Sequence, residues 1–199
     1  LRTDIVRYYA ACAVSETAEK LLVEDGESEG MFVAAAEALK NLSLTEGDAA
    51  EILLSFALSA LRESGYMIDL DGCGICGGEL GEKPYFDFAA GCFSCSACAS
   101  GTRASRSTYE LLRKCAGLSY AEEKAADGRK RALRLIRTYL AEKTEEAYPC
   151  FGEFIRLYEW RFVSSRKVRR FSGAGGRKRG HKTEKRRPAA HICMEYYGE

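Results

Sequence analysis

The stretch from residue 73 to residue 98, CGICGGELGEKPYFDFAAGCFSCSAC, holds five of the nine cysteines of this 199-residue chain. Two Cys-x2-Cys pairs, Cys73/Cys76 and Cys95/Cys98, are separated by eighteen residues, a spacing typical of four-cysteine zinc sites. Each such turn brings two sulfurs together, and Gly77 relieves the tight turn after the first pair. Because a closed set of four thiolates is typical of structural metal sites, the stretch predicts a zinc-stabilised hairpin without a catalytic role.

A second pairing is also open, because Cys92 and Cys95 are separated by two residues as well. We favour Cys95 with Cys98, since Gly91-Cys92 is typical of a turn that leads into the second pair. The alternatives to a metal are reduced, metal-free thiols or a redox pair. A redox pair is less favoured, because neither motif lies in a βαβ context.

The composition favours a soluble, cytoplasmic protein with reduced thiols. Charged residues make up 30% of the chain and hydrophobic residues 46%. There is no secretory signal and no uncharged stretch that could span a bilayer, so we expect no membrane partner. Thiols in such a compartment stay reduced, which favours a metal over disulfides. The chain begins at Leu1 and enters a helical pattern almost at once, with Thr3 as the available cap. We therefore expect it to be the later part of a longer protein.

Helical patterns flank the cysteine stretch on both sides. Before it they cover residues 4–23, 28–42 and 45–66, and the third is apolar nearly all round, which predicts a central helix. Gly65 is the expected stop of that third helix. In the second pattern the predicted buried stripe is Phe32, Ala35, Ala36, Leu39 and Leu42.

After the cysteine stretch, helix starts are indicated by two capping boxes, Ser107 with Glu110 and Ser119 with Glu122. A further amphipathic helix surrounds residues 132–140, and Pro149 is expected to open the last one. Tyr158 is predicted to face the core, whereas Trp160 falls off the apolar stripe. From Ser165 the pattern dissolves, and we expect a disordered tail.

These patterns predict a mainly α fold: a helical bundle with an inserted four-Cys zinc-knuckle or ribbon hairpin. The predicted regions are three helices in 1–70, the zinc motif in 71–101, further helices of the same domain in 102–163, and a basic tail in 164–199.

Charged residues are distributed unevenly along the chain, although its net charge is only +1. Residues 161–189 carry twelve Lys or Arg and one acid, whereas residues 1–160 carry eighteen basic and twenty-six acidic residues. The tail is therefore the predicted nucleic-acid contact, and the alternative is a merely solvated end. The candidate residues are Arg166, Lys167, Arg169, Arg170, Arg177, Lys178 and Arg179.

Signals for catalysis are missing from the sequence. The two histidines, His181 and His191, lie in the tail, and GAGGRKRG at residues 173–180 does not fit a dinucleotide-binding loop. We therefore expect a protein that is not an enzyme.

The order of these motifs resembles the C-terminal region of the RecO family over roughly residues 1–141. The matching features are Gly65-Tyr66 at the end of a long helix, the segment 73–77, the pair Tyr85-Phe86, and the segment 91–98. In this register Cys95 and Cys98 are the matching ligands, and Cys92 replaces a glycine. The resemblance also implies an N-terminal OB-fold domain, and we expect that domain to be absent from this chain, because no strand-rich segment matches it.

The resemblance implies a bacterial mediator of DNA repair and homologous recombination that hydrolyses no nucleotide. Such a protein anneals single strands and loads RecA onto single-stranded DNA coated with single-stranded-DNA-binding protein. The implied partners are single-stranded DNA, that binding protein, RecR, and also RecF and RecA, with Zn2+ as a structural ion. The alternative is a zinc-stabilised protein-interaction or RNA-binding module, and strand annealing would separate the two.

Overall fold

Helices make up most of the structure, a computed structural model that describes residues 4–22, 29–118 and 126–171, with side chains from 128 to 161 in the last range. The chain forms two units, Leu1–Ser164 and Ser165–Glu199, and the contacts described below belong to the first. Within the described ranges, no helix is both long enough and apolar enough to cross a membrane.

Three helices come before the cysteine stretch: α1 (Ile5–Leu21), α2 (Glu29–Leu44) and α3 (Ala49–Glu63). Aspartates cap two of them. The side chain of Asp4 accepts hydrogen bonds from the N–H groups of Val6 and Arg7, so Asp4 caps α1 and the expected cap at Thr3 is wrong. Asp48 caps α3 in the same way. The predicted stop is confirmed, because Gly65 follows the end of α3 with a left-handed φ of 79°.

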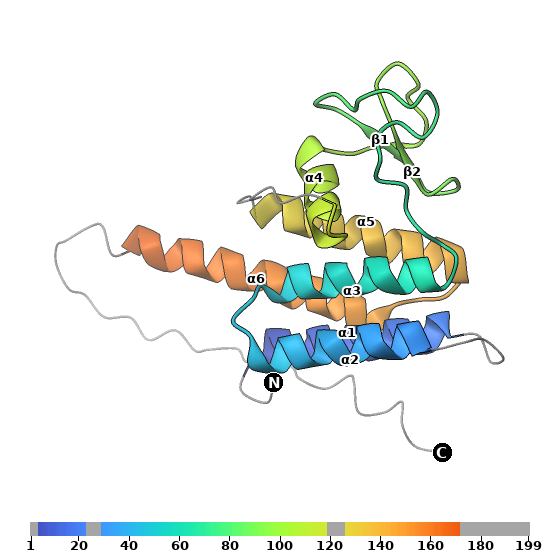
Figure 1. The fold of residues 1–199 in the computed structure, drawn as a ribbon. Helices are drawn as coiled ribbons and strands as arrows, with labels where there is room; N and C mark the ends of the chain where they lie inside the picture. Colours follow the sequence, from blue (N-terminus) through green and yellow to red (C-terminus); the bar gives the residue numbers. More distant parts are fainter. Residues whose placement is uncertain (1–3, 23–28, 119–125, 172–199) are drawn as a thin grey trace. The chain divides into compact units, whose positions relative to one another are not determined.

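Helix α3 is the centre of the bundle, as its sequence predicts. It packs against α1, α2, α4 and α5, and Figure 1 shows it between the α1–α2 pair and α5. Nearly every apolar residue along it is buried, namely Ala49, Ala50, Leu53, Leu54, Phe56, Ala57, Leu58, Ala60 and Leu61. A helix with neighbours on most sides keeps only a narrow polar stripe, here Glu51, Ser55 and Ser59, which explains its sequence pattern.

Helix α2 is rotated relative to its predicted apolar stripe. Its buried residues are Met31, Ala38 and Leu42, so the prediction for Leu42 is confirmed. Phe32 is 72% exposed and Ala36 is exposed as well, so the predictions for these two residues are wrong. The stripe was ambiguous because apolar residues stand side by side at positions 31–36, and contact with α1 and α3 selects the face that carries Met31.

The cysteine stretch and the residues just after it form a small antiparallel sheet in the order β2-β1-β3, with strands β1 (Tyr85–Asp87), β2 (Cys92–Ser94) and β3 (Thr102–Arg103). Phe86 and Phe93 face each other across β1 and β2, and both are buried. Their rings contact Tyr139 at 5.7 Å and Tyr109 at 5.1 Å between centroids. This aromatic cluster fixes the hairpin on the helices α4 and α5.

Helix α4 (Arg106–Cys115) begins one residue after Ser105, whose side chain accepts a hydrogen bond from the N–H of Thr108. The predicted capping box at Ser107 is therefore wrong, and Glu110 pairs instead with Arg106 one turn away. The second predicted box, at residues 119–122, lies outside the described residues.

The last two helices are α5 (Ala126–Thr144) and α6 (Pro149–Phe171). Pro149 opens α6, as predicted. The backbone of α6 continues to Phe171, beyond the end at residue 163 that the sequence pattern indicated. A buried carboxylate from the other end of the chain caps this helix: Glu16 of α1 accepts hydrogen bonds from the N–H groups of Cys150 at 3.1 Å and Phe151 at 3.0 Å.

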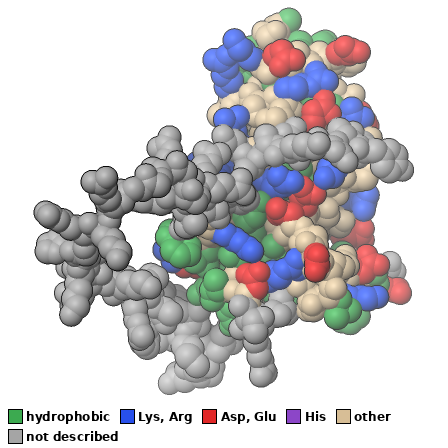
Figure 2. Space-filling model, turned by 90° about the vertical axis from the view of Figure 1, so that its left-hand side faces the viewer, with side chains coloured by type: hydrophobic (Ala, Val, Ile, Leu, Met, Phe, Trp, Pro, Cys, Tyr) green, Lys and Arg blue, Asp and Glu red, His purple; other side chains and the backbone are tan. Residues whose placement is uncertain are grey.

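Charged side chains of both signs are interspersed over the face of the described residues that Figure 2 shows. Basic and acidic groups alternate there and form no continuous basic surface. This agrees with the acidic excess of residues 1–160, which carry eighteen basic and twenty-six acidic residues.

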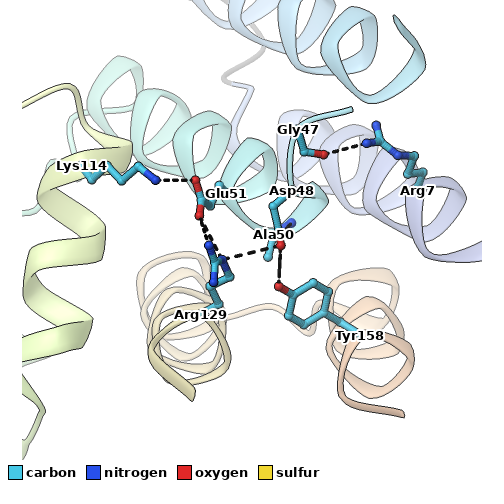
Figure 3. A network of polar contacts seen from close by, with 8 residues as sticks. All are labelled: Arg7, Gly47, Asp48, Ala50, Glu51, Lys114, Arg129 and Tyr158. Atoms are coloured by element: carbon cyan, nitrogen blue, oxygen red, sulfur yellow. Dashed lines mark hydrogen bonds and ion pairs between the residues drawn. The ribbon is translucent and has the colours of Figure 1, made fainter. Parts of the chain in front are cut away.

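A polar network joins α3 to α4, α5 and α6 (Figure 3). Glu51 accepts hydrogen bonds from Lys114 at 2.9 Å and from Nε of Arg129 at 2.9 Å. Asp48 lies 3.6 Å from Arg129 and accepts a hydrogen bond from the hydroxyl of Tyr158 at 3.0 Å. Burial disfavours the charged form of Glu51, but the hydrogen bonds from Lys114 and Arg129 outweigh it and hold the pKa of this carboxyl below its usual value.

Candidate metal centre

Four cysteine sulfurs come together at the end of the hairpin. Cys73 and Cys76 lie in a turn that precedes β1, and Cys95 and Cys98 lie in a turn that follows β2. All four Sγ atoms lie within 4.8 Å of one another, and those of Cys76 and Cys95 are 3.9 Å apart. Four thiolates at about 2.3 Å from a tetrahedral ion stand about 3.8 Å from one another. The spacing of the sulfurs therefore fits a tetrahedral metal ion.

Each of the two turns is closed by a backbone hydrogen bond of the same type. The N–H of Gly77 donates to the carbonyl of Cys73, and the N–H of Ala99 donates to the carbonyl of Cys95, each at 2.8 Å. Both donors have a positive φ, 70° at Gly77 and 41° at Ala99. Glycine adopts this conformation without strain, but alanine does not. Ala99 stands four residues after Cys95, just as Gly77 stands four residues after Cys73, so its left-handed conformation was predictable from the spacing although no residue type signals it.

Backbone donors stabilise negative charge on part of this cluster. The N–H groups of Cys76 and Cys95 lower the pKa of Cys73 to about 6, and the N–H of Cys95 lies 3.3 Å from the Cys73 sulfur. The N–H of Cys98 likewise lowers the pKa of Cys95. Hydrogen bonding with Cys76 and Cys95 raises the pKa of Cys98 to about 12, since one thiol must keep its proton among crowded sulfurs. A cation removes this conflict, and four soft donors suit Zn2+ or iron.

Cys92 lies outside the four-sulfur group in the described part of the chain. It is buried on β2, where a Cβ placed on Gly74 would stand only 2.8 Å from its sulfur. Burial, followed by the charges of Asp87 and Asp69, raises the pKa of the Cys92 thiol. The structure thus brings together the four cysteines of the favoured register, and it gives Cys92 surroundings that disfavour a thiolate.

The predicted nucleic-acid contacts fall beyond the described side chains. Arg166, Lys167, Arg169 and Arg170 belong to the last turns of α6, where only the backbone is described, and residues 177–179 lie outside the described residues. Nearer the bundle, Trp160 is 66% exposed and Tyr158 is buried, as their places on the helical pattern predicted.

The fold and the sulfur cluster define a class: a helical protein with a four-thiol hairpin inserted between its third and fourth helices. The family model described as "Recombination protein O C terminal" matches residues 2–149, which is most of the chain. The chain therefore belongs to the RecO family.

Curated relatives agree with this assignment, and each is called "DNA repair protein RecO". The protein of Myxococcus xanthus (strain DK1622) is 38% identical over 113 residues, which are 52% of this chain and 46% of the relative. That of Frankia casuarinae is 38% identical over 79 residues, 39% of this chain and 32% of the relative. That of Thermoanaerobacter sp. (strain X514) is 26% identical over 114 residues, 57% of this chain and 46% of the relative. The chain spans half or less of the length of these relatives. Their shared name describes these relatives as DNA repair proteins.

Proposed function

We propose that this chain is the helical part of a DNA-repair mediator that acts in homologous recombination in the bacterial cytoplasm. The family match over residues 2–149 carries the proposal, and the four-sulfur hairpin inside that range supports it. The activity is to anneal complementary single strands and to load RecA onto strands coated with single-stranded-DNA-binding protein, together with RecR and RecF. None of these steps needs the chain to make or break a covalent bond, so it is proposed to act by binding and not as an enzyme.

The proposed metal is one structural Zn2+ held by Cys73, Cys76, Cys95 and Cys98. When bound, it would cross-link the turn before β1 to the turn after β2, and it would hold all four sulfurs as thiolates. Purified protein should then carry about one zinc per chain. Cys95→Ser should abolish metal binding, whereas Cys92→Ser should leave the metal content unchanged. The opposite result would show that the register of ligands is wrong.

The proposed contact with DNA is the basic segment 161–187. The acidic excess of residues 1–160 should repel phosphates on average, so attraction has to be local. If about five basic residues meet phosphates, the logarithm of the binding constant should fall with the logarithm of salt at a slope near −3.5 for single strands. Little preference for base sequence is expected.

Fluorescence anisotropy with a labelled oligo(dT) tests this contact. Replacing Arg166, Lys167, Arg169 and Arg170 together with glutamine should reduce the magnitude of the salt slope by about 2.8. Circular dichroism should show that the helix content is retained. A variant that binds with the same slope as the unaltered chain would move the DNA contact away from this segment.

Strand annealing decides between the mediator and the alternative of a protein-interaction or RNA-binding module. The measurement uses two complementary oligonucleotides, one labelled with a donor dye and the other with an acceptor. The mediator should accelerate pairing well above the spontaneous rate. A chain that binds RNA and DNA equally and leaves the pairing rate unchanged would favour the alternative. Because the chain spans half or less of its relatives, the same assay should include the full-length protein.

A further inference from the structure

A cleft of about 390 Å³ lies where the small sheet meets α4 and α5. This volume is within the range of small-ligand sites in proteins, at its lower end. Its walls combine cationic and apolar side chains from three parts of the chain. Those used below are Phe88, Arg103, Ser105, Arg131, Arg134 and Leu135.

The charged side chains that line the cleft are all basic. No acidic side chain is among its lining residues in the described part of the chain. Arg103 and Arg131 are exposed, and Arg134 forms an ion pair with Glu159 of α6. Helix α4 begins at the cleft with Ser105 as its cap and has no acidic residue in its first turn, so its N-terminal dipole adds to the same field. The cleft therefore attracts anions, although residues 1–160 as a whole carry an acidic excess.

The second cleft of the bundle has the opposite character. It measures about 290 Å³, lies between α2 and α3, and is lined by Glu37, Asp48 and Glu51. Of these, Asp48 and Glu51 are held by Arg129, Lys114 and Tyr158. A phosphate would be repelled by this acidic lining. Between the two clefts, only the one at the sheet suits a polyanion.

An aromatic ring lies beside the arginines. Phe88 is half-buried and meets Phe86 edge to face, with 4.9 Å between ring centroids. Such a pair leaves at least one face of the Phe88 ring uncovered by Phe86. Leu135 of α5 contributes further apolar surface. Cationic groups next to an aromatic ring are the combination with which proteins hold single-stranded nucleic acid, since every base has a face that can stack.

We propose that this cleft binds a short stretch of single-stranded nucleic acid, with phosphates at Arg103, Arg131 and Arg134 and one base against Phe88. The inference rests on the proposed DNA contact of this chain and adds a second site on its folded part. The aromatic ring beside the arginines favours a nucleic acid over an acidic peptide, because a strand offers a base that can stack on Phe88 as well as phosphates.

The test uses the whole chain and a fluorescein-labelled oligo(dT) of about 20 nucleotides, titrated at several salt concentrations. Arg103→Gln with Arg131→Gln removes two phosphate contacts. The magnitude of the salt slope should fall by about 1.4, and the affinity at 0.1 M salt should fall about 25-fold. A double variant of the same charge change, Arg62→Gln with Arg156→Gln, alters two exposed arginines that do not line the cleft. It should bind within about twofold of the unaltered chain.

Phe88→Leu separates stacking from charge, because it keeps an apolar side chain and removes the aromatic face. We expect the affinity to fall about fivefold or more with an unchanged salt slope. If the unaltered chain does not bind oligo(dT), the proposed DNA contact and the cleft site are both refuted. If it binds, and the Arg103/Arg131 variant binds equally well with the same slope, the cleft site alone is refuted. The proposal is likewise overturned if the Arg103/Arg131 variant keeps its binding to oligo(dT) and loses its binding to a labelled peptide rich in Asp, Glu and Phe. The cleft would then be a peptide site.

Discussion

Replacing Glu51 by glutamine tests whether the polar network holds the bundle together. Glu51 is the point at which α3 meets cations from two other helices, Lys114 of α4 and Arg129 of α5. Glutamine keeps the size of the side chain and one acceptor oxygen but removes the charge. Arg129 would keep Asp48, at 3.6 Å, as a charged partner but would lose its ion pair with Glu51.

The expected cost follows from how far these side chains are buried. Glu51 is 22% exposed, Arg129 16% and Lys114 32%, so the group lies between a surface pair and a buried one. Exposed pairs contribute about 0.5 kcal/mol, and breaking a buried pair costs about 3–5 kcal/mol. We expect Glu51→Gln to lower the free energy of unfolding by about 2 kcal/mol. For a unit of this size that corresponds to a fall in Tm of about 4–8 °C.

The pH dependence has a definite sign. The folded-state pKa of Glu51 lies below its ordinary value of 4.5. The charged carboxylate of Glu51 therefore stabilises the folded state fully at pH values above its ordinary pKa. This stabilisation is lost as the pH falls through the pKa that Glu51 has in the folded state. The difference between the unaltered chain and Glu51→Gln should be constant from pH 7 to about pH 5 and should shrink at lower pH.

Urea unfolding followed by circular dichroism measures this difference at each pH. The matched control is Glu153→Gln, which removes a carboxylate that pairs with Arg156 within α6. The side chain of Arg156 is 63% exposed, so the control should cost about 0.5 kcal/mol or less. Equal losses in the two variants, or a Glu51→Gln loss that does not change between pH 7 and pH 4, would refute the role given to the network.

The two cysteine turns give a reciprocal pair of predictions, because Gly77 and Ala99 both have a positive φ. Gly77→Ala should destabilise by about 1 kcal/mol, from backbone strain alone, since no atom lies within 4 Å of a Cβ at Gly77. Ala99→Gly should stabilise by about 0.5–1 kcal/mol. Thermal unfolding of the metal-loaded chain measures both, and a destabilising Ala99→Gly would contradict the strain assigned to Ala99. At the start of α4, Ser105→Ala should cost about 1 kcal/mol and Ser107→Ala less than 0.5 kcal/mol in urea unfolding, and a reversed order would restore the capping box at Ser107. Chelation of the proposed metal should increase amide hydrogen exchange in residues 70–101 while α1, α2 and α3 stay protected. Loss of protection throughout would show that the bundle depends on the metal.

Features set by neighbouring residues could be predicted from the sequence. Pro149 opens α6 and Gly65 ends α3, because each restricts the backbone at its own position. The four cysteines could be paired because the spacing within each Cys-x2-Cys turn already brings two sulfurs together. The central place of α3 followed from its apolar surface on all sides.

Features set by packing could not be predicted in this way. Phe32 and Met31 both fit an apolar stripe on α2, and only contact with α1 and α3 decides which one is buried. The basic cleft joins Arg103 of β3 to Arg131 and Arg134 of α5, about thirty residues further along the chain. The helical sequence pattern does not distinguish these two α5 arginines from other solvent-exposed charged residues. Their meeting with Phe88 depends on how the sheet docks, which no local pattern contains.

Helix α1 depends on helix α6 for its stability, because Glu16 of α1 accepts hydrogen bonds from the first turn of α6. The two backbone partners of Glu16 stand 134 and 135 residues further along the chain. A piece cut at residue 149, where the family match ends, would leave this buried acid without those donors and would remove Phe151, Phe154 and Tyr158 from the core. The shortest piece that keeps this body therefore reaches beyond Tyr158. The same dependence orders events during synthesis, because α1 leaves the ribosome before α6 and Glu16 gains these two backbone partners only after residues 150 and 151 have followed. Completion of the bundle thus waits for nearly the whole of its sequence to be made.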